Sequence, residues 1–239
     1  MKESQTRLQN LAGRICLFRD WWKVVAPFNR FYNKSDHHEV TLRSGVRMYV
    51  RDIFGYDLPI IYEVFGKDVY HLQELDLPSN ATVFDVGAHV GSFAVAVYAR
   101  FPDARITAFE PHPDNFAFLA KNAPFAVCVN KAVAGESGTV HLGDHKASSS
   151  YALGDTGIPV EAVTLDSYIQ PLTKIDLLKV DVEGAEKDIF NHLSPESLAK
   201  VDRIMMEVHP PHAIVSFAER FRDAGLSVSI EGDILSARR

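Results

Sequence analysis

The first residues able to do chemistry are an aspartate and two glycines in residues 82–91, which read TVFDVGAHVG. The apolar run around Asp85 predicts a short buried strand over residues 82–86, followed by a turn and a helix. Gly87 can adopt backbone angles closed to other residues and lets a ligand lie against the main chain, while a helix start offers unpaired N–H groups. The pattern predicts a ligand cradle where the strand ends.

The charge of Asp85 selects the ligand, because it would repel a dinucleotide pyrophosphate and attract the ammonium of an amino-acid moiety. The spacing D-x-G-x-x-x-G places Ala88 and His89 where a dinucleotide-binding fingerprint has its second glycine. Glu110 ends the next apolar run, RITAFE, where a βαβ unit places an acid that accepts hydrogen bonds from a ribose. Pro111 then stops that strand. The cradle favours S-adenosylmethionine over NAD, with helix capping by the two acids as the alternative.

A second group of acids follows a later strand. Residues 175–180 form a nearly continuous apolar run, which is typical of a strand buried on both faces, and the run leads into DVEGAE. The acids that begin with Asp181 repel one another unless a cation lies between them. A metal ion, a lysine such as Lys179 or Lys187, or a sulfonium cofactor could supply that charge. We interpret Glu186 as a carboxylate in the first turn of a helix.

The next strand, predicted over residues 203–208, leads to Glu207 and His209 before two prolines. Residues two apart on a strand point to the same side, so these two and Asp181 form a constellation. It could hold a divalent cation such as Mg²⁺ through oxygen and imidazole ligands, or act as a general base. His209 is the first candidate for base or metal ligand, and Asp181 is either its orienting partner or the base. The alternative for His209 is a packed histidine at a strand end.

Composition narrows the class of protein. A chain of 239 residues with 46% hydrophobic content can build one sizeable core. The net charge of -6 provides no basic field to hold nucleic acid. Two cysteines, Cys16 and Cys128, are too few for a disulfide scaffold and favour a reducing, cytoplasmic location. No stretch approaches the roughly 20 apolar residues that cross a bilayer, so we expect no integral membrane segment.

The order of apolar runs predicts an α/β fold with a parallel sheet and helices on both faces. We expect an N-terminal helical lead and hairpin over residues 1–80, and a catalytic domain over residues 81–239 with a small antiparallel insertion near 135–163. The strands expected in the main sheet are residues 82–86, 105–110, 125–130, 175–180, 203–208, 226–230 and 233–236.

The N-terminal lead is predicted to be helical, because residues 1–32 carry apolar side chains at heptad spacing from Leu8 to Val25. We expect this basic helix to pack on the domain or on a second copy of the chain, and the second case would give a homo-oligomer. Association with a membrane surface is the alternative. Residues 39–51 alternate around Ser44-Gly45, which predicts a hairpin.

Taken in order, the motifs resemble those of the FkbM-type methyltransferases, a branch of the Rossmann-like S-adenosylmethionine-dependent family. The resemblance covers roughly residues 40–230 and implies a class I methyltransferase fold with a seven-stranded, mostly parallel sheet whose last two strands run antiparallel to the rest. The motifs are FDVGAHVG (84–91), FEPHPDNF (109–116), NKAVAG (130–135), a serine run (148–150), VTLDSYI (163–169), IDLLKVDVEGAEKDIF (175–190) and MEVH (206–209).

The resemblance implies S-adenosylmethionine as cofactor and methylation of a hydroxyl on a sugar or natural product, with or without a metal. Two other readings stay open. An NAD-dependent oxidoreductase is disfavoured by Asp85 and the missing middle glycine, and a cofactor-binding module without catalysis would use the N-terminal helix as its functional surface. The expected cofactor-binding residues are Asp85, Gly87, Ala88, His89, Gly91, Glu110, Pro111, Lys131, Ala132 and Asp181.

Overall fold

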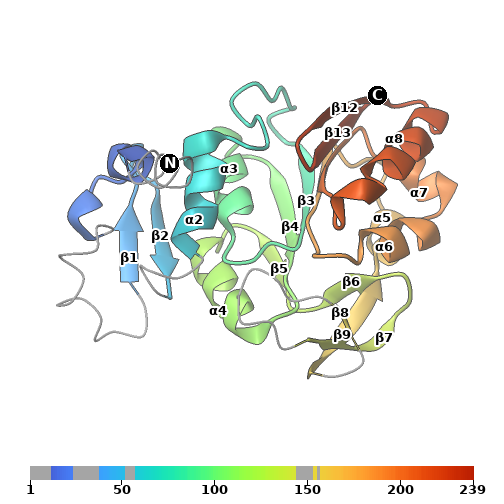
Figure 1. Ribbon diagram of the computed structural model, residues 1–239, viewed down its shortest axis with the longest axis horizontal. Helices are drawn as coiled ribbons and strands as arrows, with labels where there is room; N and C mark the ends of the chain where they lie inside the picture. The colour runs from blue at the N-terminus through green and yellow to red at the C-terminus, as the bar shows by residue number, and fades with distance from the viewer. Residues whose placement is uncertain (1–11, 24–37, 52–56, 144–152, 155–156) are drawn as a thin grey trace. The chain divides into compact units, whose positions relative to one another are not determined.

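The computed structural model describes residues 12–23, 38–51, 57–143, 153–154 and 157–239 (Figure 1). The serine run at 148–150 therefore lies outside the described residues. The chain divides into two units, Met1–Glu74 and Leu75–Arg239.

In the first unit, strands β1 (His38–Thr41) and β2 (Arg47–Val50) pair antiparallel, which confirms the predicted hairpin. Gly45 lies in the connecting turn with a φ of 93°, in the left-handed region that favours glycine. After the hairpin come helix α2 (Asp57–Tyr62) and a π-helical turn, η3 (Glu63–Lys67).

The N-terminal lead is not one continuous helix in its described part, so this prediction was wrong. Residues 12–17 are helical, but Phe18 leaves the helix, forms a β-bridge with Leu42 and is fully buried. The reason is competition from the hairpin, because the Thr41 carbonyl accepts a hydrogen bond from the Arg19 amide at 2.7 Å. A short 3₁₀ turn, η1 (Trp21–Lys23), follows. The heptad positions at Leu8, Leu11 and Val25 lie outside the described residues.

The second unit contains a seven-stranded sheet with the order β12-β13-β11-β10-β3-β4-β5. Five neighbouring strands, β11, β10, β3, β4 and β5, run parallel to one another, which confirms the predicted mostly parallel sheet. The strand bounds are β3 Thr82–Val86, β4 Arg105–Phe109, β5 Val127–Val129, β10 Leu177–Val180, β11 Arg203–Glu207, β12 Ser227–Glu231 and β13 Ile234–Arg238.

Only one of the last two strands is reversed. Strand β13 pairs antiparallel with β11, and β12 pairs antiparallel with β13, so β12 runs in the same direction as β11. The expectation that both strands run against the sheet was wrong. The physical reason is that α8 carries the chain back before β12 begins, whereas the tight turn after β12 simply reverses it.

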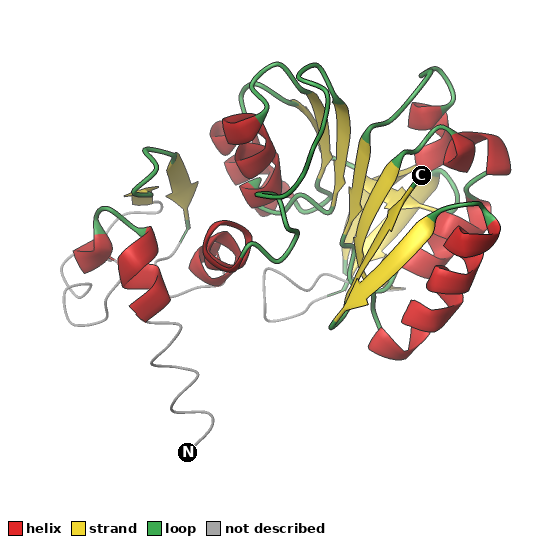
Figure 2. Cartoon of the chain, turned by 90° about the horizontal axis from the view of Figure 1, so that it is seen from above, coloured by secondary structure: helices red, strands yellow, loops and turns green. Residues whose placement is uncertain are grey.

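Helices cover both faces of this sheet, as predicted (Figure 1, Figure 2). Helices α3 and α4 lie on one side, and α6, α7 and α8 lie on the other, where Phe190, Phe217 and Phe221 pack into the apolar core. The bounds are α3 Ser92–Arg100, α4 Pro113–Asn122, α5 Leu165–Ile169, α6 Glu186–His192, α7 Pro195–Ala199, η4 Pro211–Ala213 and α8 Ile214–Asp223.

A smaller sheet has the order β6-β9-β7-β8. Strand β7 (Gly138–Leu142) pairs antiparallel with both β8 (Leu153–Gly154) and β9 (Ile158–Thr164), while β6 (Ala132–Ala134) pairs parallel with β9.

Across the described ranges, every helix is too short or too polar to pass through a lipid bilayer.

A buried carboxylate joins two strands at the amino ends of the main sheet. The Asp176 side chain accepts a hydrogen bond from the Thr82 amide at 2.8 Å and lies 3.0 Å from the Lys174 ammonium. Replacing Asp176 by Ala leaves that amide without its acceptor, so we expect the free energy of unfolding to fall by about 1–3 kcal/mol. Urea denaturation measures the change.

Asp202→Ala is the matched control, because Asp202 pairs with the same Lys174 at 2.6 Å but is partly exposed and accepts no such amide bond. We expect its loss to stay within about 1 kcal/mol. Equal losses for the two variants would contradict the proposed importance of the Thr82 hydrogen bond.

Candidate active site

The predicted site residues meet at one edge of the main sheet. Strands β3, β4, β10 and β11 are parallel, and β11, β10, β3 and β4 are neighbours in that order. Their carboxyl ends therefore lie side by side, which is where open parallel sheets bind ligands. This topology brings Asp85, Glu110, Asp181 and Glu207 to the same edge.

A buried lysine occupies the centre of this edge. Lys179 in β10 lies beside Asp85 in the register of the sheet, and its ammonium is 3.3 Å from Asp85 Oδ1. Both side chains are within the protein interior. Burial raises the pKa of Asp85 and the Lys179 charge opposes the rise. Burial lowers the pKa of Lys179, but the carboxylates of Asp85 and Asp181 raise it further, so Lys179 stays an ammonium.

The same ammonium reaches two other parts of the edge. It donates a hydrogen bond to the Gly87 carbonyl at 2.7 Å and lies 3.6 Å from Asp181 Oδ2. The sequence leaves open which cation balances the acids that begin with Asp181. In the structure, the Lys179 ammonium lies beside Asp181 and supplies this charge. The signal in the sequence was a single lysine within an otherwise apolar strand.

Asp85 does not face a ligand directly in this structure. The exposed fraction of Asp85 is 0%, and the expected contact of its carboxylate with a ligand ammonium stays a prediction. Asp85 instead acts on the cradle through Lys179, which holds the Gly87 carbonyl.

The glycine turn is fixed by its neighbours. The amides of Gly87 and Ala88 both donate to the Phe109 carbonyl, at 3.0 and 2.9 Å, which ties the end of β3 to β4. Gly87 has a φ of 80°, and a Cβ there would lie 1.7 Å from the Asp181 carbonyl oxygen. No other residue fits this position, because Asp181 passes so close.

Glu110 links the turn to the next helix. Its Oε2 accepts from the His89 amide at 2.8 Å, and its Oε1 accepts from the His112 amide at 2.9 Å and the Asn115 side chain at 3.2 Å. The side chain is buried, and burial raises its pKa from the ordinary value of 4.5 to about 7 while the hydrogen bonds oppose the rise.

The start of α3 is the second part of the cradle. Gly91 forms the N-cap with a φ of 91°, and no side chain caps the helix. The Ala94 amide of the first turn acts on the Asp85 carboxylate, and the helix dipole favours negative charge at this end of the helix. The helix start would bind the carboxylate of S-adenosylmethionine, and the Glu110 carboxylate, which accepts from the His89 amide of the same turn, would accept hydrogen bonds from its ribose.

Three further predicted residues lie at the outer side of the cradle. The Pro111 carbonyl accepts a hydrogen bond from the Asn130 side chain at 3.0 Å, and that side chain also binds the Glu110 carbonyl at 2.8 Å. Lys131 pairs with Glu161 at 2.5 Å, and Ala132 is buried in β6 of the smaller sheet. Asn130, which was not among the predicted site residues, thus orients the strand end that carries Glu110.

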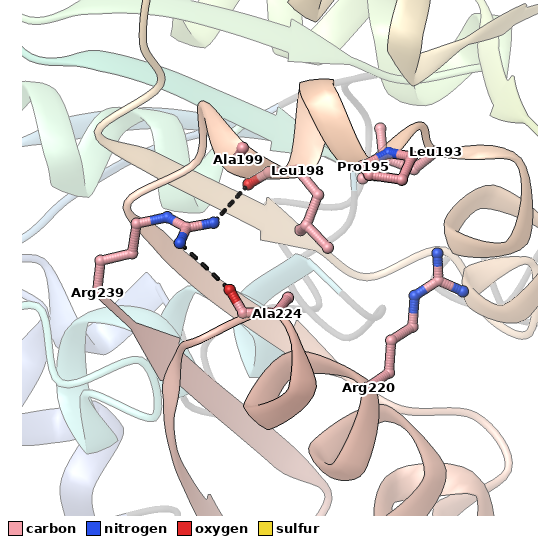
Figure 3. A pocket seen from close by; sticks show the side chains of 7 residues that line it. All are labelled: Leu193, Pro195, Leu198, Ala199, Arg220, Ala224 and Arg239. Atoms are coloured by element: carbon pink, nitrogen blue, oxygen red, sulfur yellow. Dashed lines mark hydrogen bonds between the residues drawn. The ribbon is translucent and has the colours of Figure 1, made fainter.

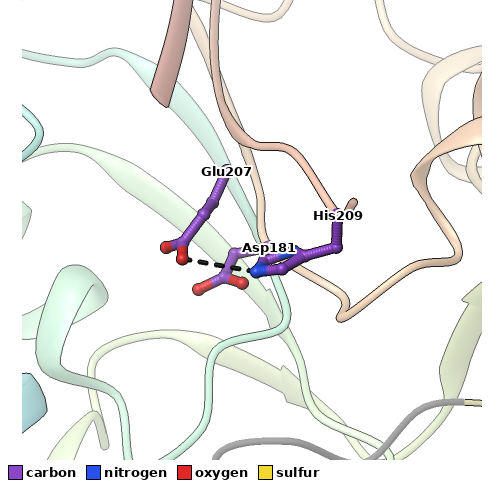
Figure 4. A group of neighbouring side chains, drawn as sticks. All are labelled: Asp181, Glu207 and His209. Carbon is purple, nitrogen blue, oxygen red and sulfur yellow. Dashed lines mark ion pairs between the residues drawn. The ribbon is translucent and has the colours of Figure 1, made fainter. Parts of the chain in front are cut away.

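His209 lies among three carboxylates. Its Nδ1 is 3.1 Å from Glu186 Oε1, and its Nε2 is 3.4 Å from Glu207 Oε1 and 3.7 Å from Glu183 Oε2. Figure 4 shows Asp181 beside the Glu207–His209 pair. The bonds to Glu186 and Glu207 raise the pKa of His209 to about 11 against the opposing effect of burial, so the ring is an imidazolium at neutral pH.

Glu186 does more than begin a helix. It is the first residue of α6, as expected, but its side chain is fully buried, and Oε1 also accepts from the Gly184 amide at 3.2 Å. It therefore fixes both the turn before the helix and the His209 ring. Sequence reasoning missed this role because the contact depends on a residue 23 positions away.

The three predicted metal ligands do come together, since ligand atoms of Asp181, Glu207 and His209 lie within 4.8 Å of one another. Two protein cations, the Lys179 ammonium and the His209 imidazolium, lie at the same group of residues. A metal ion would have to displace the proton that the carboxylates hold on His209, and the Lys179 ammonium already lies 3.6 Å from Asp181.

Removing the buried ammonium should lower the stability of the fold. In Lys179→Met the Asp85 carboxylate loses its cation, so we expect the free energy of unfolding to fall by about 3–5 kcal/mol. The double variant Lys179→Met/Asp85→Asn should lose less, because no buried charge is left. Urea denaturation of both variants and of Asp85→Asn alone measures the coupling. Additive losses in the double variant would contradict a direct ion pair.

Glu110 should make stability depend on pH. Its folded-state pKa of about 7 exceeds the ordinary 4.5, so it takes up a proton on folding. Its contribution is complete below pH 4.5 and is lost as the pH rises to about 7, with a total of about 3 kcal/mol. Glu110→Gln should flatten the unfolding free energy over this range. Unchanged pH dependence in that variant would mean that Glu110 is ionised throughout.

Comparison with known proteins agrees with this geometry. The sequence profile of the Methyltransferase FkbM domain matches residues 85–225, which includes the cradle and the acidic cluster. The 31-O-demethyl-FK506 methyltransferase FkbM of Streptomyces tacrolimicus is 26% identical, over 73% of this chain and 84% of the relative.

Two other similarities cover only part of the relative. The AMB antimetabolite synthetase AmbE of Pseudomonas aeruginosa is 31% identical over 82% of this chain, which spans 12% of AmbE. A crystal structure of methyltransferase FkbM from Methylobacillus flagellatus aligns with a TM-score of 0.51 and 10% identity, over 76% of this chain and 53% of that one. The latter similarity shows the Rossmann-like fold. Because the family profile matches its sequence over residues 85–225, the chain belongs to the FkbM methyltransferase family.

Proposed function

We propose that this protein transfers a methyl group from S-adenosylmethionine to a hydroxyl group of a sugar or natural product. The observation that carries the proposal is the position of Asp181. Its carboxylate lies 3.6 Å from the lysine that holds the glycine turn, and a ligand atom of Asp181 lies within 4.8 Å of those of Glu207 and His209. Asp181 thus lies next to the glycine turn of the cradle and also belongs to the partly exposed cluster that it forms with Glu207 and His209.

When bound, S-adenosylmethionine supplies a methyl group on a positively charged sulfur. The uncapped start of α3 would hold its carboxylate, and Glu110 would accept hydrogen bonds from its ribose. To accept hydrogen bonds from the ribose, Glu110 would give up some of the bonds that it accepts from the His89 and His112 amides.

A carboxylate, rather than His209, would remove the proton of the acceptor hydroxyl. His209 was the first candidate for the base, but a ring with a pKa raised to about 11 already carries its proton at neutral pH. Asp181 and Glu207 have side chains that are 25% and 31% exposed, so an acceptor can reach them. Asp181 would take the proton as the acceptor oxygen bonds to the methyl group, while His209 holds Glu207 in place.

The preference for oxygen rests on the family. A relative in Streptomyces tacrolimicus carries the name of a 31-O-demethyl-FK506 methyltransferase, which fits a hydroxyl acceptor on a natural product. The proposal involves no divalent cation, because Lys179 and His209 supply the positive charges of the site.

Asp181→Asn tests the assignment of the base. It keeps the size of the side chain but accepts a proton poorly, so we expect turnover to fall roughly 100-fold or more. Calorimetry should show S-adenosylmethionine affinity within about threefold of the wild type, and no response to NAD(H). Mass spectrometry of hydroxylated acceptors incubated with the protein and cofactor measures the gain of one methylene.

Asp202→Asn, at the opposite end of the sheet, is the control and should keep full turnover. Wild-type turnover in Asp181→Asn would contradict the role of Asp181. S-adenosylmethionine binding without any methylated product would favour a binding module, whereas loss of turnover in EDTA would show that a metal takes part.

A further inference from the structure

A pocket of about 310 Å³ lies between α7 and α8 (Figure 3). This volume is at the lower end of the range for small-molecule sites. Its apolar lining consists of Leu193, Pro195, Leu198, Ala199 and Ala224, and two arginines complete it. Figure 3 shows the guanidinium groups of Arg220 and Arg239 on opposite sides of this lining.

Arg239 joins the pocket to the ends of two helices. Its Nε donates to the Val201 carbonyl at 3.2 Å, its Nη1 to the Ala224 carbonyl at 3.3 Å, and its Nη2 to the Leu198 carbonyl at 3.2 Å. A guanidinium has five N–H groups, so part of its donor capacity remains after these bonds.

Arg220 has more donor capacity left. Its Nη2 donates to the Phe190 carbonyl and its Nη1 to the Asn191 side chain at 3.4 Å. The hydrogen-bond acceptors of Arg220 and Arg239 are backbone carbonyls and one asparagine side chain. Helix-end carbonyls offer only partial negative charge, and within the part of the chain that the structure describes no Asp or Glu side chain pairs with either guanidinium.

The pocket is at the far end of the sheet from the acidic cluster. Arg238 pairs with Arg203 at the start of β11, whereas Glu207 ends this strand. Four residue steps along a strand span about 13 Å, so the two sites are separate. The lining residues also take no part in the cradle, and nothing in the reaction proposed above uses them.

We propose that this pocket binds a small amphipathic carboxylate. The carboxylate would pair with Arg220, whose remaining N–H groups match the paired oxygens of such an anion. The hydrocarbon part would lie on Leu198 and Ala224. The apolar lining disfavours inorganic phosphate, because an ion with no apolar part gains nothing from that surface and loses its hydration there.

The test uses octanoate, octanol and inorganic phosphate as probes with the full chain. We expect octanoate to shift the amide NMR signals of Leu198, Ala199 and Ala224, with smaller or no shifts from the other two probes. Arg220→Gln should weaken octanoate binding roughly tenfold, because a charge-assisted hydrogen bond is lost. Arg222→Gln, on the same helix but outside the pocket, should leave binding unchanged.

Equal binding of octanol and octanoate would overturn the proposal in favour of a purely apolar pocket. Equal binding of phosphate would overturn it in favour of a general anion site. Unchanged octanoate affinity in Arg220→Gln, or no shift of the three amides by octanoate, would overturn it outright. Arg220→Lys keeps the charge and should retain more affinity than Arg220→Gln, which separates loss of binding from loss of folding.

Discussion

The candidate site depends on the contacts of the Lys179 ammonium. This ammonium lies in the interior between Asp85 and Asp181 and binds the Gly87 carbonyl, so one charge holds the ends of β10 and β3 and the turn that follows. A buried charge is stable only with such partners. The three contacts are therefore coupled, and the geometry of the glycine turn follows from the charge balance beneath it.

A second cation organises the exposed side of the same edge. His209 is protonated because Glu186, Glu207 and Glu183 surround it, and the buried Glu186 orients the ring through its Nδ1 atom. The cluster thus balances its negative charge with side chains of the chain itself. In the proposed reaction this balance assigns the roles, because a histidine that keeps its proton would not act as the base and would instead orient the carboxylates.

The Arg220–Arg239 pocket has the opposite charge from the cluster around His209. The acidic cluster is rich in carboxylates that need cations, whereas the pocket has two guanidinium groups and only carbonyl and amide oxygens around them. The two sites also lie at opposite ends of β11, so each end of one short strand carries a different charge environment. An anion bound in the pocket would not compete with the cofactor or the acceptor.

Residue patterns along the chain predicted the parallel sheet, most of its strands and the family, because apolar periodicity and glycine positions are local properties. They also brought Asp181, Glu207 and His209 together correctly, since parallel strands share an edge. The burial of Asp85, its pairing with Lys179 and the contact of Glu186 with His209 became visible only in the folded chain. Likewise, the heptad spacing places Phe18 in a helix, but in the structure Phe18 forms a β-bridge with Leu42. These outcomes depend on long-range contacts and desolvation, which residue spacing along the chain does not encode.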